Sequence, residues 1–121
     1  MKLYESERKV MEILWREGAI PAKRVSELLA EEVGWNKNTT YTVLKKCVEK
    51  GAVERTEPGF VCRALIGKEE AQEEEVDDVI ERVFGGSVDL LFATLLKKDK
   101  LTPEQIENLR RMVDELEGEE K

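Results

Sequence analysis

The sequence predicts a mainly α-helical protein with one small β-hairpin, and two observations support this fold class. Apolar residues recur at the spacing of an amphipathic helix in three segments before residue 51 and in three more after residue 67. Between these groups, the pattern changes to two short β-rich runs around a Pro-Gly pair. We therefore expect three helices, then a hairpin, then three further helices.

The first two helices are predicted in residues 5–17 (ESERKVMEILWRE) and 21–33 (PAKRVSELLAEEV). Ser6 is the expected N-cap of the first helix, and Gly18 ends it. Pro21 is expected at the first position of the second helix, where its fixed φ and its missing N–H are tolerated.

The third helix is predicted in residues 37–50, with Asn36 as its N-cap and Gly51 in a left-handed conformation after its end. Helical spacing turns one stripe inward, and this stripe consists of Thr40, Val43, Leu44, Cys47 and Val48. The outer face then consists of Asn38, Thr39, Tyr41, Thr42, Lys45, Lys46 and Glu49. This face is basic and rich in small hydrogen-bonding groups.

The hairpin is predicted from the runs AVERT (residues 52–56) and FVCRALI (residues 60–66). Pro58 and Gly59 occupy the two central positions of the turn between them, which indicates a type II turn because Gly accepts a positive φ at the second position. Three helices followed by a two-stranded hairpin, with an unusual polar face on the third helix, is the order of a winged helix-turn-helix.

The C-terminal region is predicted to form three helices, in residues 68–86, 87–98 and 102–118. The last has Thr102 as its N-cap and Pro103 at its first position. Its apolar residues are separated by three, four and three positions, as in the seam of a coiled coil. These residues are Ile106, Leu109, Val113 and Leu116.

Charge is distributed unevenly along the chain, whose net charge is −7. Residues 1–66 hold 12 Lys and Arg against 10 Asp and Glu, whereas residues 67–121 hold 8 against 17. An acidic segment is compatible with DNA binding if it forms an arm held away from the duplex. We therefore predict a winged-helix DNA-binding domain in residues 1–67 and a helical dimerisation region in residues 68–121.

The outer face of the third helix predicts that the protein binds double-stranded DNA. A helix that reads the major groove needs Lys to contact phosphates and short polar side chains to contact base edges. On this helix the residues expected to contact DNA are Lys37, Asn38, Thr39, Tyr41, Thr42, Lys45 and Lys46. Two alternatives stay open: an ordinary solvated surface, and a protein–protein interaction module that uses the winged helix without DNA.

The apolar stripes of the C-terminal helices predict a homodimer. Short helices with continuous apolar stripes cannot hide all of them within one small arm, whereas a two-fold partner buries the same patch on both chains. The residues expected at the interface are Val83, Phe84, Leu91, Leu95, Ile106, Leu109, Val113 and Leu116. The alternative is that these helices pack back onto the winged helix of the same chain.

The sequence gives no indication of catalysis, of a metal site or of a cofactor, so we expect no enzyme. His is absent, which removes the most common general base and transition-metal ligand. Cys47 and Cys62 stand apart without a CxxC pair, which fits a reducing, cytoplasmic setting. The acidic residues 73–78 lie on a predicted helix, where side chains diverge and cannot wrap around a cation. Because no run of 18 apolar residues exists, no membrane partner is expected.

Three blocks of the sequence resemble one known family. They are ERKVMEILW in the first helix, W-x-K-N-T-T-Y-T-V-L with the following K-G-A-V, and RVFGGS…LL…KLTPEQIENLRRMVDEL. The last block is the most specific, because a generic winged helix would not share it. Over nearly its whole length the chain resembles the penicillinase repressor family, the winged-helix repressors of β-lactamase and methicillin-resistance genes, which have copper-responsive relatives.

The resemblance implies a homodimeric transcriptional repressor that blocks transcription by occupying a palindromic promoter operator, with its third helix in the major groove. It implies that the wing contacts phosphates through Arg55 and Arg63. It places the base-reading segment on Asn38, Thr39, Tyr41 and Thr42. At Tyr41, many members of the family have Lys.

Two departures concern the signal that releases such a repressor from DNA. Thr94 and Leu95 stand where the antibiotic-resistance repressors have a cleavable Asn-Phe bond. The final residues DELEGEEK hold none of the cysteines that form the CxC pair of the copper-responsive relatives. The resemblance therefore implies repression but neither of these two release signals.

Overall fold

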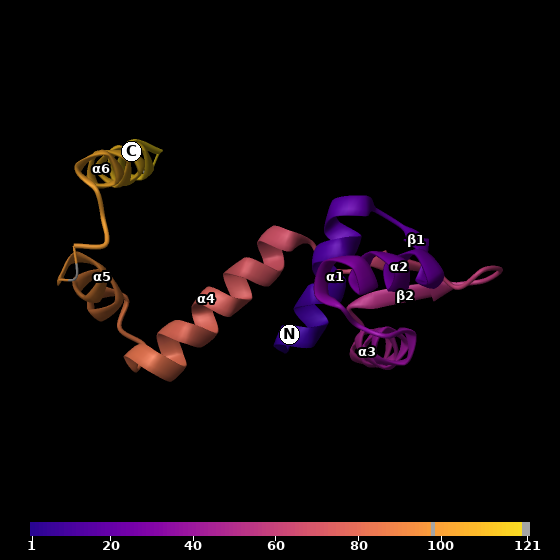
Figure 1. Ribbon diagram of the computed structural model, residues 1–121. Helices are drawn as coiled ribbons and strands as arrows, with labels where there is room; N and C mark the ends of the chain where they lie inside the picture. Colours follow the sequence, from indigo (N-terminus) through magenta and orange to yellow (C-terminus); the bar gives the residue numbers. More distant parts are fainter. Residues whose placement is uncertain (98, 120–121) are drawn as a thin grey trace. The chain divides into compact units, whose positions relative to one another are not determined.

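The computed structural model describes residues 1–97 and 99–119, and this part of the chain holds six helices and three strands (Figure 1). The elements are α1 (Glu5–Glu17), β1 (Ile20–Pro21), α2 (Ala22–Val33), α3 (Lys37–Lys50), β2 (Val53–Thr56), β3 (Val61–Ala64), α4 (Lys68–Phe84), α5 (Val88–Lys97) and α6 (Pro103–Glu119). The predicted fold class, mainly α with one small hairpin, is confirmed. Residues 98, 120 and 121 of the predicted C-terminal region lie outside the described residues.

The chain divides into two compact units, Met1–Val76 and Asp77–Lys121. The division falls inside α4, so the first unit contains α1 to β3 and the beginning of α4. The predicted domain boundary after residue 67 falls at the start of α4 and stays a prediction.

The core of the first unit lies among α1, α2, α3 and the sheet. Its largest fully buried side chains include Met11, Ile13, Leu29 and Leu44, which come from the inward faces of the three helices. The inward stripe predicted for α3 is confirmed, since Thr40, Val43, Leu44 and Cys47 are buried and Val48 is half-buried. This packing leaves the opposite face of α3 open to solvent.

The sheet has a third strand that the sequence analysis missed. The strand order is β1-β3-β2, with Pro21 opposite Val61 in the antiparallel pair of β1 and β3. The prediction that Pro21 begins the second helix is wrong by one residue, because Pro21 is the N-cap of α2 and ends β1. An edge strand tolerates Pro because no N–H is needed on its open side.

The N-cap predicted for α1 is also wrong. The helix begins at Glu5, with Tyr4 as its N-cap, so Ser6 lies inside the first turn. The carboxylate of Glu7 accepts the backbone N–H of Tyr4 at 2.8 Å, which satisfies a donor at the helix start without Ser6.

The hairpin turn spans residues 57–60 between the paired residues Thr56 and Val61. Gly59 has the positive φ (89°) that the Pro58–Gly59 turn requires. Phe60 also has a positive φ, 48°, which is uncommon for a bulky residue. The peptide bond between Glu57 and Pro58 is cis.

The helices of the second unit begin at side-chain caps. Ser87 Oγ accepts the N–H of Leu90 at 3.0 Å at the start of α5. At the start of α6, Thr102 Oγ1 accepts the N–H of Gln105 at 3.1 Å and the Gln105 side chain accepts the N–H of Thr102 at 2.8 Å. The predicted Thr102 cap and the Pro103 start are confirmed.

Candidate nucleic-acid interface

The local sequence fixes both ends of α3. Asn36 Oδ1 accepts the N–H of Thr39 at 2.8 Å, as predicted for an N-cap. Gly51 has φ 86° and ψ 12°, the left-handed conformation that ends the helix. The first turn contains no acidic residue, so the partial positive charge of the helix N-terminus stays available to an anion.

The predicted DNA-contact residues of α3 occupy its solvent face, which we call the polar face. Thr39 and Tyr41 are half-buried. The exposed members of the polar face are Lys37, Asn38, Thr42, Lys45 and Lys46. A macromolecular partner can therefore reach these five side chains.

The three lysines of the polar face are set apart by their lack of ion pairs with the described residues. Among the described residues, no carboxylate forms an ion pair with Lys37, Lys45 or Lys46, although ion pairs occur elsewhere on α1, α2 and the hairpin. Lys37 Nζ lies over the ring of Tyr41, 5.7 Å from its centroid. Lysines without an ion-pair partner in this part of the chain, beside the exposed Asn38 and Thr42, fit a helix that contacts phosphates and bases.

The hairpin meets the polar face through an aromatic contact. The rings of Tyr41 and Phe60 are in edge-to-face contact, with centroids 5.7 Å apart and planes at 77°. The Arg55 guanidinium lies over the Phe60 ring, 3.7 Å from its centroid. A groove of about 280 Å³ runs between α3 and the hairpin, and it is lined by Tyr41, Lys45, Val48, Arg55 and Phe60.

The two arginines predicted to contact phosphates from the wing lie on opposite faces of the hairpin. Residues directly opposite in an antiparallel pair share a face. Arg55 is opposite the buried Cys62, whereas Arg63 is opposite Glu54. The structure therefore brings Arg55 together with the polar face but does not bring Arg63 to it.

Each wing arginine is paired with a carboxylate. Arg55 donates to Glu57 Oε1 from Nε at 2.8 Å, and its Nη2 lies 2.7 Å from the same oxygen. Arg63 Nη2 lies 3.1 Å from Glu54 Oε1. Sequence reasoning missed Glu57 and Phe60, although their position beside the Pro-Gly turn was the available signal.

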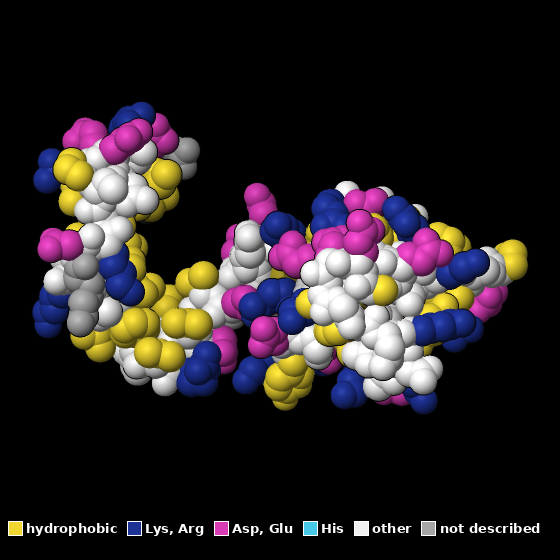
Figure 2. Space-filling model, in the orientation of Figure 1, with side chains coloured by type: hydrophobic (Ala, Val, Ile, Leu, Met, Phe, Trp, Pro, Cys, Tyr) yellow, Lys and Arg dark blue, Asp and Glu magenta, His cyan; other side chains and the backbone are white. Residues whose placement is uncertain are grey.

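The second unit exposes a large amount of apolar surface. In the described part of the chain, no residue after Ala71 is buried, and Figure 2 shows hydrophobic side chains gathered on α5 and the end of α4. A groove of about 350 Å³ between α5 and α6 is lined mainly by Phe92, Leu96, Leu101, Ile106, Leu109 and Val113. Of the residues predicted for dimerisation, Val83, Val113 and Leu116 are more than half exposed, and Phe84, Leu91, Leu95, Ile106 and Leu109 are half-buried.

Both cysteines are buried in the first unit. Burial raises the pKa of the Cys47 thiol to about 12 and that of Cys62 to about 11, so both thiols are protonated near neutral pH. Across residues 1–97 and 99–119, no group of three or more His, Cys, Asp or Glu side chains is arranged to hold a metal ion. Within the same residues, no helix combines the length and apolar character that crossing a membrane requires.

The sequence profile of the penicillinase repressor family matches residues 3–115. The chain belongs to this family. The family resemblance predicted from the three sequence blocks is thereby confirmed.

Characterised relatives match this family member over most of its length. The penicillinase repressor of Bacillus licheniformis is 24% identical over 122 residues, which cover 99% of this chain and 95% of the relative. The methicillin resistance regulatory protein MecI of Staphylococcus aureus (strain N315) is 24% identical over 118 residues, which cover 93% of this chain and 96% of the relative.

Two solved structures resemble more than half of the chain. The DNA-binding domain of the repressor BlaI is 25% identical, has a TM-score of 0.53, and matches over 57% of this chain and 87% of that chain. Monomeric BlaI of Bacillus licheniformis in complex with the blaP half-operator is 25% identical, with a TM-score of 0.52 over 58% of this chain and 88% of that chain. The predicted winged-helix fold is confirmed.

Proposed function

We propose that this member of the penicillinase repressor family is a homodimeric transcriptional repressor that binds a palindromic promoter operator in the cytoplasm. In this proposal α3 enters the major groove of each half-site and the bound dimer excludes the transcription machinery. The observation that carries the proposal is the polar face of α3, where three lysines that form no ion pair with any described residue share a helix face with the exposed Asn38 and Thr42.

Each group on the polar face has a separate role in the proposal. Lys37, Lys45 and Lys46 contact phosphates, and the α3 N-terminus adds its partial positive charge. Asn38, Thr39, Tyr41 and Thr42 contact base edges, because Asn pairs with adenine and Thr contacts bases through its hydroxyl or methyl group. The relative BlaI, whose structure is known with a half-operator, supports DNA as the partner.

The dimer is proposed from the apolar surface of the second unit. Exposed side chains such as Leu96, Val113 and Leu116 on α5 and α6 gain the hydrophobic stabilisation of burial only when a partner covers them. A two-fold axis buries the same patch on both chains. It also sets two α3 helices about 34–36 Å apart, one turn of DNA, or a multiple of this distance.

The proposal is tested by selection of bound duplexes from a random pool at two salt concentrations, with fluorescence anisotropy on the enriched sequences. We expect a two-fold palindrome whose affinity falls steeply as salt rises. If no sequence is enriched and no salt-dependent binding is measured, the protein is a protein–protein interaction module and the proposal is wrong.

A further inference from the structure

The carboxylate of Glu57 lies in a ring of N–H donors at the tip of the hairpin. Its Oε1 accepts from Arg55 Nε at 2.8 Å and lies 2.7 Å from Arg55 Nη2. Its Oε2 accepts the backbone N–H of Phe60 at 3.1 Å. These contacts hold the pKa of Glu57 below its usual value, so the carboxylate is charged near neutral pH.

Contacts that do not involve Glu57 hold most of these N–H donors in place. The Arg55 guanidinium lies over the Phe60 ring at 3.7 Å, and that ring is in edge-to-face contact with Tyr41 of α3. The carbonyl of Phe60 accepts the N–H of Ala22 at 2.8 Å, which ties the turn to the start of α2. The donors would therefore keep their positions if the carboxylate left.

We propose that Glu57 is an internal competitor for DNA: in the free protein its carboxylate occupies the place at the hairpin tip where a DNA backbone phosphate binds Arg55. The inference rests on the proposed function, which it deepens by adding a built-in control of wing affinity. The site consists of the Arg55 guanidinium and the Phe60 N–H.

A phosphate fits this site for reasons of chemistry and position. Guanidinium groups bind phosphate and carboxylate oxygens with the same two-donor geometry, so one anion can replace the other. The site lies beside Lys45 and Tyr41 of the polar face, with which Arg55 shares a groove. The Glu57 side chain is 58% exposed, so it can turn into solvent when a phosphate takes its place.

The Glu57 carboxylate lowers the affinity of the wing for a phosphate that no other part of the interface holds in place. While Glu57 is bound, the charge of Arg55 is neutralised and attracts DNA weakly. A phosphate displaces the carboxylate only when the rest of the interface holds the duplex against the hairpin. The arrangement therefore lowers the affinity for every duplex that contacts the wing, the operator included.

A double-mutant cycle with Glu57→Gln and Arg55→Gln tests this inference on the full chain and the selected operator duplex. Gln keeps an oxygen for the Phe60 N–H but loses the charge that holds Arg55. We expect Glu57→Gln to tighten binding by about two- to fivefold, the range that exposed ion pairs allow. We also expect the slope of log K against log salt concentration to become steeper by up to about 0.9, the value for one added phosphate contact.

In the Arg55→Gln background, the same Glu57→Gln change should have only the small effect of removing one negative charge, so the two substitutions are coupled. Glu54→Gln is the matched control, because it removes an equal charge from the other face of the hairpin and should show no coupling to Arg55→Gln. Circular dichroism verifies that each variant is folded.

The outcomes separate the two proposals. If the wild-type protein binds the operator but positions 55 and 57 show no coupling, this inference alone is overturned. The same holds if Glu57→Gln and Glu54→Gln have equal effects in both backgrounds. If no variant binds any duplex, the proposed function is overturned and this inference with it.

Discussion

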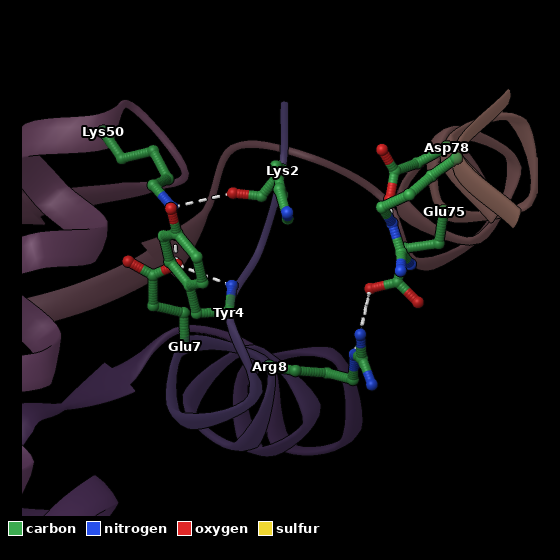
Figure 3. A network of polar contacts seen from close by, with 8 residues as sticks. Lys2, Tyr4, Glu7, Arg8, Lys50, Glu75 and Asp78 are labelled. Carbon is green, nitrogen blue, oxygen red and sulfur yellow. Dashed lines mark hydrogen bonds and ion pairs between the residues drawn. The ribbon is translucent and has the colours of Figure 1, made fainter.

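Lys50, the last residue of α3, donates a hydrogen bond from Nζ to the buried carboxylate of Glu7 on α1 at 2.5 Å (Figure 3). The Glu7 side chain is only 4% exposed. Lys50 also donates to the carbonyl of Lys2 at 2.7 Å and lies over the Tyr4 ring, 4.7 Å from its centroid. Lys50 therefore holds the end of α3 against α1, whereas Lys37, Lys45 and Lys46 form no ion pair with any described residue.

Glu7→Gln should lower the free energy of unfolding by about 1–3 kcal/mol, because Gln keeps an acceptor oxygen but loses the charge that strengthens the hydrogen bond from Lys50 in a nearly buried site. Urea denaturation at pH 7 measures this change. Glu12→Gln is a control on the same helix, since Glu12 forms an exposed ion pair with Lys68 at 3.3 Å and should cost less than about 1 kcal/mol. Equal effects of the two substitutions would contradict the structural role of Lys50 and Glu7.

The Glu7 contribution to stability should depend on pH. Burial raises the pKa of Glu7, but hydrogen bonds from Lys50 and from the Tyr4 backbone outweigh it, and the net pKa lies below its usual value. The unfolded chain therefore takes up this proton at a higher pH than the folded chain. The contribution is complete well above pH 4.3, the approximate pKa of an unperturbed Glu, and is lost as pH falls through the lowered folded-state pKa.

The check is urea denaturation of wild type and Glu7→Gln at several pH values between neutrality and the acid limit of folding. The stability difference between the two proteins should shrink below about pH 4.3. A difference that stays constant over this range would show that the Glu7 charge does not stabilise the fold.

Thr40→Val should stabilise the protein. Thr40 is fully buried on the inward side of α3, and its Oγ1 finds no hydrogen-bond partner among the described residues. Val has nearly the same shape without the buried hydroxyl, so we expect a gain of about 1 kcal/mol in the free energy of unfolding. The control Thr42→Val changes an exposed position of the same helix, where stability should change little. Thermal unfolding that finds Thr40→Val less stable than wild type would refute this expectation.

Substitutions on the polar face should separate base contacts from phosphate contacts. Thr39→Ala or Thr42→Ala should weaken binding to the selected operator by about 1–3 kcal/mol and reduce discrimination against a scrambled duplex. Lys45→Ala should weaken binding to both duplexes. It should also reduce the slope of log K against log salt concentration by about 0.9 in magnitude. Anisotropy titrations with both duplexes provide the measurement. Normal binding by all three variants would mean that α3 is not the DNA-reading helix.

Leu109→Glu or Val113→Glu should abolish the dimer, because each places a charge in the apolar groove between α5 and α6. Sedimentation velocity gives the oligomeric state, and operator binding should be lost together with the dimer. Glu107→Ala, on an exposed position of α6, is the control and should remain dimeric. A monomeric wild-type protein would disprove the proposed assembly.

The elements that the sequence predicted correctly are those with local signals. Apolar periodicity located all the helices of the described chain, and Asn36, Gly51 and Thr102 marked helix ends by their own side-chain or backbone chemistry. Strand β1 left no such signal, because two residues are too few to show a period and its pairing partner Val61 is distant in the sequence.

The candidate site was predictable only in part, because some of its contacts join residues that are distant in the sequence. Helical spacing predicted which side of α3 faces solvent, but not that Thr39 and Tyr41 on this side are half-buried. The opposite orientations of Arg55 and Arg63 depend on the register of β2 against β3, which is set by a four-residue turn. The contacts of Phe60 with Tyr41 and of Glu57 with Arg55 depend in turn on this register and on the positive φ of Phe60.

One titration decides whether the protein reads DNA as a dimer through two copies of α3. The selected palindrome and the same duplex with one half-site scrambled are each titrated with wild-type protein, and the number of chains per duplex is determined at saturation. We expect two chains per palindrome and a loss of affinity of at least about tenfold on scrambling, since about 1–3 kcal/mol is at stake for each base pair that is changed. Equal affinity for the two duplexes, or one chain per palindrome, would contradict the proposed function.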